Sequence, residues 1–220
     1  MIYVIKHRED GRTYPEGYQE LKVGPIYDGP IESMNRLNPY INELTGLNDI
    51  WELTDDEVVG LCHYRRFFME SSTKILSWEY AQELAQKYDM IVAPSYSFLK
   101  PLRENIIDHM PRQQETVDKY LQMLRYLEPG TREYFRSERF NPTNMFIAKR
   151  EVMDDYCLWL FPIITAMACR FEAEDADKDN NPAYKRLIGY IGERLLTYYI
   201  QKEGLKVKEW PVEMIEGGSR

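Results

Sequence analysis

Val58-Val59-Gly60-Leu61-Cys62-His63-Tyr64-Arg65-Arg66 is an apolar, β-branched run that passes directly into a histidine, a tyrosine and two arginines. The apolar part predicts a buried strand. Residues 2–5 repeat the pattern and end at Lys6, His7 and Arg8. In α/β sheets, ligands bind beyond the carboxyl ends of the strands. The two polar clusters are therefore expected to share one crevice.

The rest of the chain alternates between strand-like and helix-like patterns. Further strands are predicted at 88–94, 145–148 and 206–212, and helices at 39–51, 77–86, 151–171 and 183–202. Residues 9–39, rich in Gly, Pro and Asp, are interpreted as a long structured loop. This alternation favours an α/β fold whose mixed, mostly parallel central sheet is flanked by helices. Because no stretch is typical of a linker, residues 1–220 are expected to form a single domain.

Composition and charge narrow the class of protein. The net charge of −8 weighs against a protein that binds nucleic acid mainly by neutralising phosphates. The three cysteines, Cys62, Cys157 and Cys169, indicate neither a disulfide framework nor a zinc site. Pro162 interrupts the longest apolar run, so no transmembrane segment is predicted. The charged residues after Met1 do not suggest a signal peptide, and a cytoplasmic location is the expectation.

Several catalytic classes lack their motifs. The sequence contains no GxxxxGK[ST], GxGxxG or GxSxG segment, which argues against P-loop, Rossmann and serine-hydrolase sites. Its three histidines, at positions 7, 63 and 109, exclude an HExxH metal site.

The polar clusters have two interpretations each. Arg65 and Arg66 could bind a diphosphate through their fixed donor forks, but spacing alone favours a salt-bridged pair at a strand end. Asn38 is the predicted cap of the helix at 39–51. Glu193, between apolar residues of the last helix, could be a general base or could pair with a neighbouring arginine, and composition leaves these two readings even.

Several segments in order resemble one family. Residues 27–29 (YDG), 35–40 (NRLNPY), 42–45 (NELT) and 59–68 (VGLCHYRRFF) are similar to the N-terminal signature of bacterial glycosyltransferases of capsular and exopolysaccharide biosynthesis. Residues 144–147 (NMFI), 156–161 (YCLWLF) and 189–196 (GYIGERLL) are similar to the C-terminal motifs of the same family. The resemblance covers nearly the whole chain.

The resemblance implies a GT-A-like hexosyl- or pentosyltransferase that moves a sugar from a nucleotide-sugar donor, most naturally a UDP-sugar, to a glycan or lipid-linked glycan. It implies that Glu193 is the catalytic base. It also implies donor-binding roles for His7, Arg8, Asp28, Asn35, Asn38, Glu43, His63, Tyr64, Arg65, Arg66 and Asn144.

The segment His63-Tyr64-Arg65-Arg66 differs from the acidic motif expected of a GT-A enzyme. GT-A enzymes normally hold a metal with an acidic Asp-x-Asp at a strand end, where this chain has His63-Tyr64-Arg65-Arg66. The arginines could neutralise a leaving diphosphate directly. A site without a metal ligand is therefore predicted, and a site that uses Mn²⁺ or Mg²⁺ is the alternative.

Two other functions stay open. A phage-type transferase would use a hydroxylated base in DNA as acceptor, against which the acidic charge weighs. A non-catalytic nucleotide-sugar or carbohydrate-binding module would keep the crevice but use Glu193 as a structural ion-pair partner.

Overall fold

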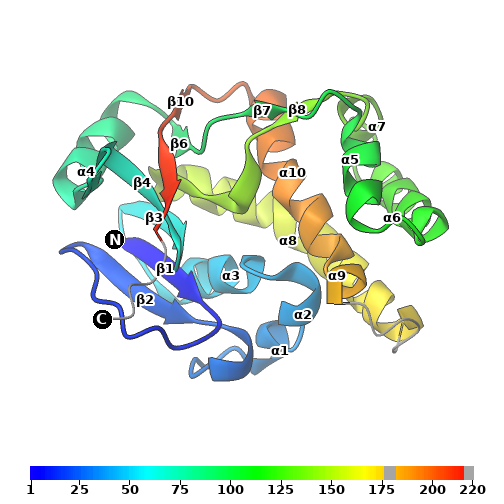
Figure 1. Cartoon of the computed structure of the whole chain (residues 1–220), viewed down its shortest axis with the longest axis horizontal. Coiled ribbons are helices and arrows are strands. Elements are labelled where there is room, and N and C mark those ends of the chain that lie inside the picture. Colours follow the sequence, from blue (N-terminus) through cyan, green and yellow to red (C-terminus); the bar gives the residue numbers. More distant parts are fainter. Residues whose placement is uncertain (176–181, 216–220) are drawn as a thin grey trace.

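The structure is a computed structural model that describes residues 1–175 and 182–215. A mixed β-sheet forms its centre (Figure 1). The main path of the sheet runs in the order β10 (Val207–Glu209), β6 (Met90–Val92), β9 (Phe146–Lys149), β3 (Val58–His63), β1 (Ile2–Lys6) and β2 (Tyr18–Lys22). Both pairings of β1 and the β10–β6 pairing are parallel, and both pairings of β9 are antiparallel. The predicted mixed, mostly parallel sheet is confirmed.

A second group of strands branches from β3. The chain turns at Tyr64 and Arg65, so that His63 pairs with Arg66 and β4 (Arg66–Ser71) runs antiparallel to β3. β5 (Lys74–Ile75) and β11 (Val212–Met214) pair with β4. β7 (Tyr96–Ser97) and β8 (Arg139–Phe140) form a separate two-stranded ribbon.

The helices flank the sheet (Figure 1). They are α1 (Glu32–Asn35), α2 (Asn38–Ile41), α3 (Leu44–Leu53), α4 (Trp78–Lys87), α5 (Leu102–His109), α6 (Gln114–Leu127), α7 (Thr131–Tyr134), α8 (Arg150–Asp175), α9 (Pro182–Lys185) and α10 (Leu187–Glu203), with 3-10 turns η1 (Gly24–Ile26) and η2 (Pro142–Asn144). Ser77 caps α4 as its sequence predicts, because its hydroxyl accepts from the backbone N–H of Tyr80.

The sheet separates two apolar cores. Because successive side chains of a strand point to opposite faces, Tyr3 and Ile5 pack into the larger core with α3, α8 and α10. Ile2 and Val4 pack into the smaller core with β4 and α4. Strand β1 is therefore buried on both faces, and its carboxyl end is fixed relative to the helices.

Helix α8 is the one helix in the described ranges that could cross a membrane by length and composition, over residues 150–174. Half of its apolar window is buried inside the fold, where α8 packs against α3, α6 and α10. The helix also contains Pro162.

Local predictions are wrong at four places. The strand predicted at 206–212 is two strands, β10 and β11, which pair with different partners, and the helix predicted at 183–202 is divided into α9 and α10. The loop predicted at 9–39 contains the edge strand β2, whose sequence Tyr-Gln-Glu-Leu-Lys lacks a continuous apolar run because only Tyr18 is buried. The single helix predicted at 39–51 is two helices, α2 and α3, separated at Asn42, which has a positive φ of 54°. Asn38 lies inside α2 and is not its cap; its side-chain amide donates to the Asn42 carbonyl (2.9 Å) and to the Thr45 hydroxyl (2.8 Å), which stabilises the break.

Candidate functional site

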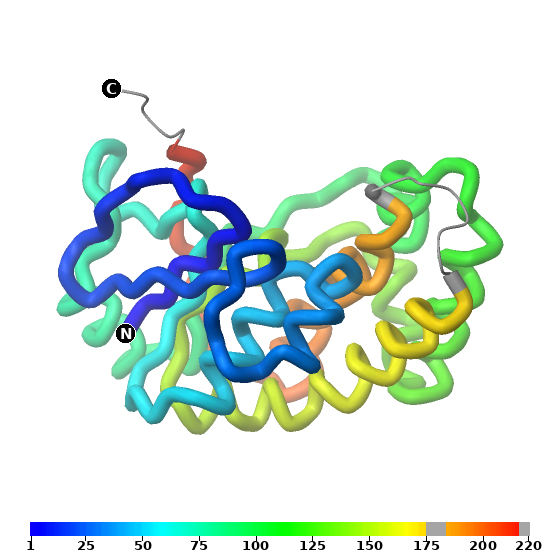
Figure 2. The backbone as a smooth tube through the Cα atoms, turned by 90° about the horizontal axis from the view of Figure 1, so that it is seen from below, coloured from blue at the N-terminus to red at the C-terminus, as the bar shows by residue number. Residues whose placement is uncertain are grey.

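A cavity of about 590 Å³ opens at the carboxyl ends of β1 and β3. Its other walls are the α2–α3 junction, η2 and the beginning of α10. Figure 2 shows the chain of α1 and α2 beside the start of α10, and α2 and α10 are in contact. The cavity is lined by Ile5, His7, Val23, Pro25, Asn38, Pro39, Asn42, Glu43, His63, Tyr64, Arg65, Arg66, Thr143, Lys185, Arg186, Gly189, Tyr190 and Glu193.

The predicted motif His63-Tyr64-Arg65-Arg66 forms one wall, and all four of its residues line the cavity. Arg65 lies in the turn between β3 and β4, and Arg66 begins β4. Tyr64 is buried, with the Arg65 guanidinium carbon 5.0 Å from its ring centroid and that of Arg8 5.2 Å away. The sequence could not show whether both arginines face the crevice, and in the structure both are among the residues that line it.

His63 is neutral at pH 7 in this environment. Burial lowers the pKa of His63 to about 4, and the positive charge of Arg66 acts in the same direction. Its Nε2 atom is buried and has no hydrogen-bond partner within the described residues. The Nε atom of Arg65 is also buried and has no hydrogen-bond partner within the described residues. Buried polar atoms usually have a hydrogen-bond partner, and an ordered water or a polar ligand in the cavity would supply one.

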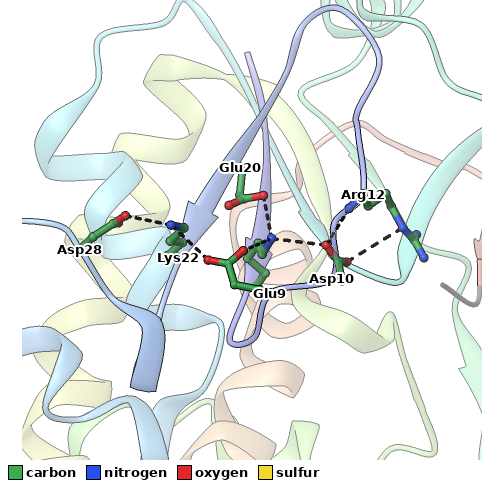
Figure 3. Close-up of polar contacts among 7 residues, drawn as sticks. Glu9, Asp10, Arg12, Glu20, Lys22 and Asp28 are labelled. Atoms are coloured by element: carbon green, nitrogen blue, oxygen red, sulfur yellow. Dashed lines mark hydrogen bonds and ion pairs between the residues drawn. The ribbon is translucent and has the colours of Figure 1, made fainter. Parts of the chain in front are cut away.

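His7, which follows strand β1, lines the cavity, and the buried Lys6 at the end of the strand has three carboxylate partners, Glu9, Asp10 and Glu20, which Figure 3 shows. The Lys6 side chain is 1% exposed, and its ammonium contacts Glu20 (2.7 Å), Glu9 (3.0 Å) and Asp10 (3.3 Å). Burial opposes the charge of Lys6, but these three carboxylates raise the pKa of Lys6 above its ordinary value. Lys6 therefore stays charged and bound.

Two carboxylates, Glu43 and Glu193, line the cavity. Glu43, just before α3, accepts a hydrogen bond from Asn144 Nδ2 at 2.8 Å, and burial raises its pKa. Glu193, on α10, accepts one from the backbone N–H of Thr143 at 2.7 Å. Its second oxygen lies 3.5 Å from Arg194 Nη1. The sequence-based alternative of a Glu193–Arg194 pair is thus present in the structure, although Glu193 also lines the cavity.

Four predicted donor-binding residues lie outside the cavity lining. Asp28 is exposed and pairs with Lys22 at 3.2 Å (Figure 3). Asn35 fastens the chain at Gly24, accepting from its N–H (2.7 Å) and donating to its carbonyl (3.2 Å). Arg8 lies against Tyr64, and Asn144 is buried behind Glu43.

The cavity also contains residues that the sequence did not single out. Arg186, before α10, donates from Nε to Asn42 Oδ1 at 3.1 Å, and its guanidinium carbon is 5.6 Å from the ring of Tyr190. Lys185 adds a further cation to the lining. Two basic residues before the last helix are a weak sequence signal for a wall of the cavity. Their position beside Asn42 depends on the tertiary structure and cannot be predicted from the sequence.

The side chains at this cavity do not form a metal site of the Asp-x-Asp kind. Among the described residues no group of three or more His, Cys, Asp or Glu side chains is placed to hold an ion. The end of β3, where such carboxylates would be expected, carries Arg65 and Arg66.

Comparisons with known proteins agree with the architecture. No curated protein matches the chain. Among solved structures, the apo form of the bifunctional glycosyltransferase WbbM is similar, with a TM-score of 0.75 and 23% identity over 98% of this chain and 45% of that one. The chain thus spans less than half of WbbM, and the likeness shows a shared fold. Residues 1–204 match the family model described as a domain of unknown function, DUF4422, and the chain therefore belongs to the DUF4422 family.

Proposed function

We propose that the protein is a glycosyltransferase that moves a hexosyl or pentosyl group from a nucleotide-sugar donor, first of all a UDP-sugar, to a hydroxyl of a glycan or lipid-linked glycan. The observation that carries this proposal is the cavity at the ends of β1 and β3, which combines Arg65, Arg66, Lys185 and Arg186 with two carboxylates. The fold shared with WbbM, a bifunctional glycosyltransferase, supports the same class of reaction.

The basic side chains suit the leaving group of such a reaction. When the sugar is transferred, the bond between its anomeric carbon and the diphosphate breaks, and negative charge builds up on the departing oxygen. Guanidinium groups at fixed positions stabilise that charge and bind phosphate oxygens in a bidentate manner. We propose that Arg65 and Arg66 form this clamp in a GT-A-like site, without Mn²⁺ or Mg²⁺.

The carboxylates suit the acceptor side of the reaction. A hydroxyl becomes a competent nucleophile when a positioned base takes its proton, an effect of roughly 10²–10⁴-fold. Glu193 is the base that the sequence predicts, and Glu43 is a second carboxylate of the same cavity. In this proposal the enzyme contributes to capsule or another polysaccharide synthesis from the cytoplasm.

Donor hydrolysis tests the proposal, because a transferase without an acceptor can pass the sugar slowly to water. A panel of UDP-, GDP- and TDP-hexoses and pentoses is incubated with the protein in excess EDTA, and free nucleoside diphosphate is measured. We expect release from at least one donor, with unchanged rate when Mn²⁺ or Mg²⁺ replaces the chelator. Release that strictly requires the metal would refute the metal-free clamp.

A binding module is the second candidate, because Glu193 is already engaged by the Thr143 N–H and lies near Arg194. Such a module would bind a nucleotide sugar without releasing nucleoside diphosphate. The hydrolysis assay combined with a binding measurement separates the two functions.

A further inference from the structure

The two carboxylates of the cavity differ in how much of their hydrogen-bonding capacity the protein uses. Glu193 has one oxygen on the Thr143 N–H at 2.7 Å and the other 3.5 Å from Arg194, whose own side chain is 1% exposed. Glu43 Oε1 accepts from Asn144 at 2.8 Å, whereas its Oε2 receives no hydrogen bond from another described residue. Its other donor is its own backbone N–H, so Glu43 retains the capacity to accept a hydrogen bond from a ligand.

One short turn orients both groups. Thr143 and Asn144, in η2, have positive φ angles of 82° and 51°, a conformation that costs energy in residues other than glycine. The backbone N–H of Thr143 then binds Glu193, and the side chain of Asn144 binds Glu43. Backbone strain of this kind is common where a protein fixes functional groups.

We propose that Glu43 is the general base for the acceptor hydroxyl and that Asn144 is its positioning residue, while Glu193 supports the turn. This inference rests on the proposed function. The acceptor O–H proton passes to Glu43 Oε2 as the acceptor oxygen forms a bond to the anomeric carbon. The bond to the donor diphosphate breaks, and its electron pair leaves with the nucleoside diphosphate beside Arg65 and Arg66. Glu43 then releases the proton to solvent.

The surroundings of Glu43 fit this role. Burial raises the pKa of Glu43, and a carboxylate with a pKa nearer neutrality is a stronger base. The hydrogen bond from Asn144 and the charges of Arg186 and Arg66 act in the opposite direction. The other titratable groups lining this cavity are His7, His63, Tyr64, Arg65, Lys185, Tyr190 and Glu193.

Two isosteric substitutions separate the carboxylates. Glu43→Gln keeps an oxygen for Asn144 but cannot take a proton, and we expect its donor-hydrolysis rate to fall by roughly 10²–10⁴-fold. Glu193→Gln keeps an oxygen for the Thr143 N–H, and we expect a loss below about tenfold. UDP affinity within about threefold of the wild type in both variants shows that the fold and the clamp survive. A loss in Glu43→Gln no larger than that in Glu193→Gln overturns the assignment.

The pH profile provides a second readout. In Asn144→Gly, glycine accepts the positive φ while the amide that lowers the pKa of Glu43 is removed. We expect the acid limb of the rate profile to move to higher pH in this variant and to stay in place in Glu193→Gln. An unmoved limb in Asn144→Gly contradicts the positioning role. If the wild type hydrolyses no donor of the panel, the proposed function itself fails, which is a different result.

Discussion

Arg66 offers the most direct perturbation of the proposed diphosphate clamp. It is the first residue of β4 and lines the cavity, and none of the ion pairs among the described residues involves it, so its guanidinium is available to a ligand. A hydrogen bond between charged partners contributes about 1.5–3 kcal/mol. Arg66→Ala should therefore weaken UDP binding by roughly 10- to 150-fold.

Isothermal titration calorimetry with UDP in EDTA measures this loss. Arg66→Lys keeps the charge without the planar fork and should lie between the wild type and Arg66→Ala. Arg136→Ala is the matched control, because Arg136 is exposed, pairs with Glu133 at 3.0 Å and does not line this cavity. UDP affinity in Arg66→Ala within threefold of the wild type, or an equal loss in Arg136→Ala, would refute the clamp.

Three further predictions concern stability. Gly189→Ala should lower the free energy of unfolding by about 1–3 kcal/mol in urea titrations, because its Cβ would lie 2.0 Å from Asn42 Nδ2; an unchanged midpoint would contradict this close approach of α10 and α2. Burial lowers the pKa of His63 from 6.5 to about 4, so the unfolded chain binds a proton at higher pH than the native state does. The free energy of unfolding of the wild type should therefore fall by up to about 3 kcal/mol relative to His63→Gln as pH falls from 6.5 to 4. Parallel stability curves for the two proteins would contradict this prediction. Burial raises the pKa of Asp49 from 3.8 to about 6, so the carboxyl ionises at lower pH in the unfolded chain than in the native state. The wild type should therefore lose stability relative to Asp49→Asn as pH rises from 4 to 6. A stability difference that does not change with pH would contradict the burial of this carboxyl.

The strands that build the cavity could be predicted because they are buried on both faces. The runs that become β1 and β3 are continuous and apolar, so their carboxyl ends could be located from the sequence alone. The edge strand β2 is charged and could not be recognised in this way. The kink at Asn42 was equally invisible, because it depends on the side chain of Asn38 and on the close approach of Gly189.

The lining of the cavity could be predicted best where residues adjoin in sequence and least where they meet only through the fold. His63, Tyr64, Arg65 and Arg66 share one hairpin turn, so a single motif contained all four. The hydrogen bond between Glu43 and Asn144 joins positions 101 residues apart, and Arg186 meets Asn42 across 144. Asp28 and Asn35 belong to the same ordered motifs, yet they stabilise neighbouring loops. The organisation of residues 1–220 as one domain stays a prediction.

The proposed function requires that the cavity bind a nucleotide-sugar donor. A thermal-shift screen of nucleotide sugars in EDTA tests this binding directly. A ligand that binds only the native state increases the free energy of unfolding by mass action, by about 2.7 kcal/mol at 100 times its Kd, and so raises the unfolding temperature. We predict that at least one UDP-sugar raises the unfolding temperature of the wild type and that Arg66→Ala reduces the shift. The absence of a shift with every nucleotide sugar would contradict the claim.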